Sequence, residues 1–182
     1  MKVLLVNKFL FPKGGAETYV FDVGKMLEEH GHEVQFFGLE NPKNTVGNHI
    51  EKYVTDMDFS KGIKANLNAP FRIVYSVEAR RKICAVLDDF MPDVVHLNIN
   101  EYHLTPSIIL EIKNWRHKTG RECRIIYTAH DYQLICPSHG LFDSNIIPCE
   151  KCLDCHYIHC FTTKCLKKSR AKSLLGTLDG YF

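Results

Sequence analysis

Apolar residues alternate along the chain between short runs and longer stretches of helical periodicity. Residues 3–6 are a continuous apolar run, which is typical of a strand buried on both faces of a parallel sheet. A glycine-containing loop follows, and Gly31 ends the next helical stretch. The apolar positions of that stretch share one helical face: Ala16, Tyr19, Val20, Val23, Met26 and Leu27. Because residues 33–37 are rich in strand formers, residues 2–37 predict a strand, a crossover helix and a parallel strand.

The same alternation continues toward the C-terminus. Residues 77–90 carry a helical apolar stripe that stops at Pro92 and leads to a strand at 94–97. Thr105 and Pro106 form a cap and first-turn pair for a helix that precedes a strand at 124–128. Residues 40–70 show no sustained period and predict loops, with a short strand near Tyr53 and Val54. The pattern predicts an α/β fold, with a Rossmann-like open parallel sheet and flanking helices.

Open parallel sheets bind ligands beyond the carboxyl ends of their strands, so the first loop is a candidate site. Gly14 and Gly15 stand at the start of a helix, where bare amides and the positive helix end can approach a phosphate or a sugar. A plain tight turn explains such a glycine pair equally well. Glu17 falls in the first turn, where the helix dipole favours a carboxylate with or without a ligand.

Two further loops begin at the same edge of the predicted sheet. His130 and Asp131 directly follow the fourth strand and are placed to hydrogen-bond a sugar hydroxyl or a phosphate. Asn98, Asn100 and His103 occupy the equivalent loop after the third strand, where they either face the same cleft or cap the loop.

Composition narrows the class of protein. The 182 residues are 45% hydrophobic and 24% charged, which is ordinary for one globular domain, and a net charge of +2 does not imply a polyanionic partner. A Gly-x-Gly-x-x-Gly fingerprint does not follow the first strand, which disfavours a nicotinamide or flavin cofactor. The N-terminus does not have the pattern of a signal peptide, and we expect a cytoplasmic protein, free or at the inner face of the membrane.

Four segments, in order, resemble family-4 glycosyltransferases: residues 8–17 (KFLFPKGGAE), 31–34 (GHEV), 92–96 (PDVVH) and 127–131 (YTAHD). The resemblance implies the N-terminal half of a GT-B fold. In that fold the N-terminal domain binds the acceptor and a C-terminal domain binds the nucleotide-sugar donor. It also implies a retaining hexosyl transfer without a catalytic metal, to an acceptor in cell-surface glycan synthesis or to a lipid-linked acceptor.

By the same resemblance, His130 contacts the transferred sugar, Gly14 and Gly15 lie by the donor phosphates and the acceptor, and Glu17 supports their loop. The family's paired glutamates of the donor-binding domain have no counterpart in residues 1–182. We therefore expect a single acceptor-side domain over 1–182, with the donor-binding domain absent and no transfer by this segment alone. Nucleic acid is not an expected partner.

A cysteine-rich insertion spans residues 136–165. Cys149 and Cys152 have the spacing of a zinc knuckle, and Cys160 and Cys165 complete a set of four for a structural zinc ion. A zinc ribbon would carry a second Cys-x-x-Cys pair, so reduced free thiols remain the alternative. In a cytosolic chain this clustering favours metal or free thiols over disulfides.

After Phe161 the chain carries a basic cluster beside a predicted helix through Leu174, Leu175 and Leu178: Lys164, Lys167, Lys168, Arg170 and Lys172. These residues either contact anionic lipid or form a solvated face of the helix. Two other functions compete with glycosyl transfer. One is a zinc-stabilised interaction module that binds nucleic acid or protein, and the other is a self-sufficient α/β cofactor-binding protein.

Overall fold

The computed structural model, which describes residues 1–56, 75–100 and 103–181, contains a parallel sheet in the strand order β2-β1-β3-β4. The strands are β1 (Lys2–Val6), β2 (Glu33–Phe37), β3 (Val94–Leu97) and β4 (Arg124–Tyr127). In register, Val3 lies opposite Val34 on one side and Val94 on the other. The parallel α/β fold predicted from the sequence is confirmed. The short strand expected near Tyr53 and Val54 is an isolated parallel bridge between Leu39 and Val54.

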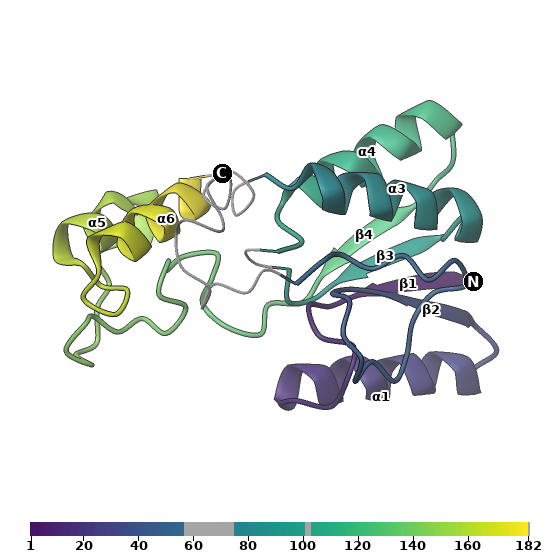
Figure 1. Ribbon diagram of the computed structural model, residues 1–182, viewed down its shortest axis with the longest axis horizontal. Helices are drawn as coiled ribbons and strands as arrows, with labels where there is room; N and C mark the ends of the chain where they lie inside the picture. Colours follow the sequence, from purple (N-terminus) through teal and green to yellow (C-terminus); the bar gives the residue numbers. More distant parts are fainter. Residues whose placement is uncertain (57–74, 101–102, 182) are drawn as a thin grey trace. The chain divides into compact units, whose positions relative to one another are not determined.

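Helices cover the two faces of the sheet. Helix α1 (Gly15–Glu29) lies on one face, and α3 (Val77–Phe90) and α4 (Ser107–Thr119) lie on the other (Figure 1). Alternate residues of β1 pack on opposite faces of the sheet, because successive side chains of a strand point to opposite faces. Leu5 packs in the cluster under α1, whereas Leu4 packs in the larger cluster under α3 and α4. This explains why residues 3–6 are apolar without interruption.

The buried face of α1 agrees only in part with the predicted stripe. Val20 is buried as predicted, and Val23 and Leu27 pack against the cluster under α1. Tyr19 and Met26 are exposed, however, and Glu17 and Gly24 are buried. Gly24 belongs to the buried face because a Cβ added there would lie 2.7 Å from Cζ of Phe36, so the absent side chain lets the Phe36 ring approach α1.

The start of α4 also differs in detail from the prediction. Thr105 has a φ of +60°, and the helix begins at Ser107 with Pro106 at the capping position. The Thr105 hydroxyl is 2.6 Å from the Ser107 hydroxyl and accepts a hydrogen bond from the Ser76 amide. These buried bonds tie the start of α4 to the start of α3, and Thr105 therefore serves both helices.

The described residues divide into two compact units, which we call the N-terminal unit (Met1–Thr128) and the C-terminal unit (Ala129–Phe182). The C-terminal unit contains the cysteine-rich segment 136–165, a short 3-10 helix η3 (Leu153–Cys155), α5 (Ile158–Thr163) and α6 (Arg170–Tyr181). The assignment of 1–182 to one domain stays a prediction. The part of the expected loop at 57–70 lies outside the described residues.

Helix α6 is the helix expected through Leu174, Leu175 and Leu178. Its buried residues are small, namely Ser173, Gly176 and Thr177, whereas Leu174 and Leu178 are exposed. Small residues on the inner face let α6 lie close to α5. Among the described residues, the helices are all too short or too polar to cross a membrane.

Candidate active site at the carboxyl edge of the sheet

Asn7, the residue directly after β1, is fully buried and links several segments at the carboxyl edge of the sheet. Its side-chain amide donates to the carbonyl oxygen of Phe9 at 2.8 Å and to Oε1 of Glu17 at 3.4 Å. Its side-chain oxygen accepts a hydrogen bond from the amide of Ile99 at 3.2 Å. Asn7 therefore joins the first loop, the first turn of α1 and the loop after β3.

Glu17 lies in the first turn of α1 and is only 4% exposed. A buried carboxylate is costly unless it is hydrogen-bonded or lies near positive charge, and Asn7 together with the positive end of the helix provides both. The side chain is turned inward beneath the glycine pair. This position suits a residue that holds the loop in shape.

The N-terminus of α1 is open. Gly14 occupies the capping position in an extended conformation, and among the described residues no side chain caps the first amides of this helix. Helix α3 differs, because Oγ of Ser76 accepts a hydrogen bond from the amide of Ala79. A Cβ added to Gly15 would meet nothing within 4 Å. Packing among the described residues therefore does not require glycine at position 15. A ligand that approaches the backbone amides closely would require it.

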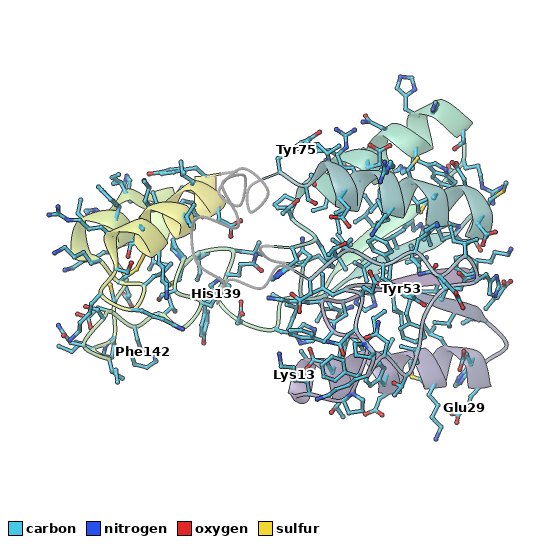
Figure 2. All side chains as sticks on the ribbon, in the orientation of Figure 1. Lys13, Glu29, Tyr53, Tyr75, His139 and Phe142 are labelled. Atoms are coloured by element: carbon cyan, nitrogen blue, oxygen red, sulfur yellow. A yellow bond between two sulfur atoms is a disulfide. The ribbon has the colours of Figure 1, made fainter. Side chains whose placement is uncertain are left out.

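Two lysines, Lys8 and Lys13, belong to the loop that leads to this helix end. Nζ of Lys13 lies 3.4 Å from the centre of the Phe9 ring, and Nζ of Lys8 lies 5.4 Å from the same ring. Figure 2 shows Lys13 at the N-terminal end of α1, with Glu29 at the opposite end. The ammonium groups add to the positive end of the helix dipole, and together they favour an anionic ligand such as a phosphate.

The predicted residues of the loop after β3 are buried. The Asn98 side chain donates to the carbonyl oxygens of Val6 and His96, each at 3.4 Å. His103 is 5% exposed, and its Nε2 lies 3.1 Å from Oδ1 of Asp56. These contacts hold the loop against β1 and against the segment before residue 57. The roles of Asn98 and His103 in substrate binding stay predictions.

The structure brings together three residues that the sequence analysis did not select. Nε2 of His96 lies 2.8 Å from Oγ1 of Thr128, and the Tyr19 hydroxyl lies 3.5 Å from the same oxygen. The rings of Tyr19 and His96 meet edge to face. The alternation of side chains along β3 places His96 on the same face as Val94, under α1. The two-residue alternation along β3 could have identified His96 from the sequence. Tyr19 comes from the first turns of α1.

His130 and Asp131 belong to the C-terminal unit. Asp131 accepts a hydrogen bond from the amide of Gln133 at 2.8 Å, and its second oxygen lies 3.2 Å from Nδ1 of His139. His130 is half-buried. The glycine loop belongs to the N-terminal unit, and the predicted meeting of His130 with it stays a prediction.

Two open depressions in the described part of the surface lie elsewhere in the N-terminal unit. One, of about 570 Å³, is lined by basic residues near the C-terminal end of α4, including Arg116 and Arg121. The other, of about 430 Å³, lies between α3 and α4 and is lined by Arg80 and Glu111, among others. Neither includes a residue selected from the sequence, so the candidate site rests on the loops at the carboxyl edge.

The four cysteines proposed for zinc are not gathered as four thiols. Cys160 and Cys165 form a disulfide, which differs from the reduced thiols expected in a cytosolic chain, while Cys149 and Cys152 are free. Within the described ranges, no group of three or more His, Cys, Asp or Glu side chains is placed to hold a metal ion. Zinc binding at these residues stays a prediction.

Comparisons with known proteins bear on the family of this chain. The family model for Glycosyltransferase Family 4 matches residues 13–151. A Klebsiella pneumoniae protein described as "Uncharacterized 42.6 kDa protein in cps region" is 26% identical over 155 residues, which cover 78% of this chain and 40% of that protein. The chain thus spans less than half the length of this relative. No solved structure gives a significant match. The family match extends over most of the chain, from the glycine loop into the cysteine-rich segment, and the chain belongs to Glycosyltransferase Family 4.

Proposed function

We propose that residues 1–182 form the acceptor-binding half of a retaining glycosyltransferase of the GT-B fold. The reaction moves a hexosyl group from a nucleotide-sugar to a cell-surface glycan or to a lipid-linked acceptor. Family membership supports the transferase class. The words "cps region" in the name of the Klebsiella relative support a role in polysaccharide biosynthesis.

The observation that carries the proposal is the open N-terminus of α1. Gly15 is free of packing constraints, the first amides of the helix lack a side-chain cap, and Lys13 adds positive charge beside them. Negative charge develops on the diphosphate as the sugar leaves. Preorganised amides and ammonium groups stabilise such charge without having to reorganise during the reaction. Asn7 and Glu17 act as positioning residues, because they hold the loop that presents these groups.

In this mechanism His130 contacts the transferred sugar, and the donor nucleotide is bound by a separate domain. Catalysis then rests on holding the donor and the acceptor in line and on stabilising the departing diphosphate. A catalytic metal ion is not part of the proposal.

The test uses the full-length protein with Gly15→Ala. An alanine has room in the folded chain and favours a helix, so the melting temperature should hold or rise. The added methyl group would stand between a phosphate and the amides, and kcat/KM should fall at least about tenfold, equivalent to about 1.4 kcal/mol. Gly140→Ala is the matched control, since the nearest atom to a Cβ there, in the Phe142 side chain, would be at the ordinary contact distance of 3.5 Å. Unchanged kcat/KM in Gly15→Ala would contradict the proposed phosphate site.

A contact with anionic lipid extends the proposal to the acceptor side. Lys167, Lys168, Arg170 and Lys172 are exposed, and Leu174 and Leu178 are exposed on α6, the helix that begins at Arg170. Each basic side chain near an anionic bilayer contributes on the order of 1 kcal/mol, which is enough for a few of them to dock a protein. Sedimentation of the full-length protein with phosphatidylserine vesicles should exceed that with phosphatidylcholine vesicles and should fall with salt. Equal sedimentation with both would oppose this contact.

A further inference from the structure

Thr128 is the last residue of the N-terminal unit, and hydrogen bonds tie it to two other elements. Its amide donates to the carbonyl oxygen of Leu97 at 2.9 Å, which continues the pairing of β3 and β4 by one residue. Its Oγ1 lies 2.8 Å from Nε2 of His96 and 3.5 Å from the Tyr19 hydroxyl. The backbone of Thr128 is thus held by β3, and its side chain by β3 and α1.

His96 is a costly residue for a buried strand position. It is 8% exposed and lies in register with Leu5 on one side and with Ile126 on the other. An apolar side chain would pack there without a polar partner, whereas a buried imidazole requires hydrogen bonds. The contact with Thr128 is one that an apolar side chain could not make.

His130 follows Thr128 with only Ala129 between them. Two residues span at most about 7 Å, so the place of Thr128 limits the place of His130. The chain is also held after His130, because Asp131 accepts a hydrogen bond from the amide of Gln133 at 2.8 Å. His130 therefore lies between an anchored residue and a hydrogen-bonded turn.

Tyr19 connects this anchor to the helix end that carries Gly15. The two residues are four positions apart in α1, which places them on one face of the helix, about 6 Å apart along its axis. In the proposed reaction the amides near Gly15 hold the diphosphate, and His130 contacts the sugar that is bonded to it. The donor fixes the spacing of these two groups, and a misplacement of about 1 Å can cost on the order of 10²-fold in rate.

We propose that Thr128 is a positioning residue for glycosyl transfer, because its hydroxyl group, held by His96 and Tyr19, fixes the place of His130. The role of His130 is taken from the proposed function, on which this proposal rests. Thr128 acts through His130 and not on the substrate.

The test compares Thr128→Val, which removes the hydroxyl group and keeps the branched shape, with Thr128→Ser, which keeps the hydroxyl group. The full-length protein is assayed with UDP-glucose, UDP-galactose and GDP-mannose as probe donors, and release of the nucleoside diphosphate measures turnover. Thr128→Val should lower kcat at least about fivefold, the effect of one lost hydrogen bond. The KM of the donor should change little, because the nucleotide is bound by a separate domain. Thr128→Ser should keep kcat within about twofold of wild type.

Thr119→Val is the matched control. The Thr119 hydroxyl donates to the carbonyl oxygen of Trp115 at 2.8 Å at the C-terminal end of α4, so this variant also loses one side-chain hydrogen bond. It should keep the kcat of wild type. An equal loss of kcat in Thr119→Val and Thr128→Val would assign the effect to general destabilisation and would overturn the proposal.

A double-variant cycle shows whether Thr128 acts through His130. In the presence of His130→Ala, Thr128→Val should cause no further loss of kcat, because the side chain that it positions is gone. The same additional loss in both backgrounds would overturn the proposal, as would a Thr128→Val enzyme with the kcat of wild type. Wild-type turnover in His130→Ala would instead contradict the proposed role of His130, and the role of Thr128 would fall with it.

Hydrogen exchange tests the anchor without turnover. The Thr128 amide is bonded to Leu97, and its exchange should be at least about fivefold faster in Thr128→Val than in wild type and unchanged in Thr128→Ser. Unchanged exchange in Thr128→Val overturns the proposal whether or not a probe donor is turned over. A wild-type protein that turned over none of the three donors would count against the proposed function, and the exchange result would then decide on the anchor alone.

Discussion

The side-chain amide of Asn7 donates a hydrogen bond to Oε1 of Glu17, 3.4 Å away, and so connects the end of β1 to the first turn of α1. Both side chains are buried. The same Asn7 side chain bonds Phe9 within the loop and Ile99 beyond β3. The position of the open helix end therefore depends on a single amide group that is enclosed by the segments it joins.

Asn7→Ala should lower the free energy of unfolding by about 2 kcal/mol, because it leaves the Ile99 amide and the Glu17 carboxylate buried without this partner. Urea unfolding of the full chain measures the change. Asn114→Ala is the control, since Asn114 is exposed on α4. A loss no larger than that of the control would mean that the hydrogen bonds of Asn7 do not stabilise the loop.

The lowered pKa of Glu78 leads us to expect a loss of folding stability in acid. Burial opposes its ionisation, but hydrogen bonds from Lys82 and Thr55 outweigh burial and lower its pKa to about 2. A carboxyl group whose pKa falls on folding stabilises the folded state above its unfolded pKa of 4.5. That stability is lost as the pH falls from about 4.5 to about 2.

Glu78→Gln should therefore reduce stability at pH 7 and should flatten the dependence of stability on pH between about 4.5 and 2. Denaturant unfolding at several pH values gives the slope. Glu28→Gln, at an exposed glutamate of α1, should leave the slope as it is. The same acid slope in Glu78→Gln and wild type would show that other groups are responsible.

The strands were predictable because burial on both faces of a parallel sheet leaves a mark in the sequence. Residues 3–6 must be apolar throughout, and the structure places them at β1, between β2 and β3. The buried face of α1 was predictable only in part. Val20 lies on it as the apolar period indicated, but the face also includes Gly24, which leaves space for the Phe36 ring, and hydrophobic periodicity does not register a glycine as a contact residue.

The candidate site was partly predictable for a similar reason. The carboxyl-edge rule for parallel sheets selected the loop with Gly15, but it did not reveal that Glu17 turns inward to Asn7. That contact joins side chains from two different elements and has no sequence period. The disulfide between Cys160 and Cys165 was also beyond prediction, because spacing alone does not determine which of eight cysteines pair.

His130→Ala in the full-length protein should reduce turnover strongly while leaving the melting temperature within about 2 °C of wild type, as a half-buried loop side chain contributes little to stability. The reason is loss of the proposed contact with the transferred sugar. Steady-state kinetics measures turnover, and His117→Ala, at an exposed position of α4, is the control. Turnover equal to that of the control would remove His130 from the proposed mechanism.

The raised pKa of Asp179 leads us to expect the opposite dependence of folding stability on pH from that of Glu78. Burial in α6 raises the pKa of its carboxyl group to about 6, although the nearby His139 lowers it in part. The unfolded chain ionises near 3.8, so stability is full below that pH and declines as the pH rises to about 6. Above that pH the ionised carboxylate costs up to about 3 kcal/mol, at 1.36 kcal/mol per pKa unit.

Asp179→Asn should remove this cost and make the protein up to about 3 kcal/mol more stable at pH 7.5, with little change at pH 3.5. Urea unfolding across this range provides the measurement, with Asp22→Asn at an exposed position of α1 as the control. The two carboxyl groups act in different pH ranges, since Asp179 governs the interval from about 4 to 6 and Glu78 the interval below about 4.5. A variant that gained equally at pH 3.5 and 7.5 would owe its stability to the amide's hydrogen bonds, and the Asp179 carboxylate would carry no ionisation cost.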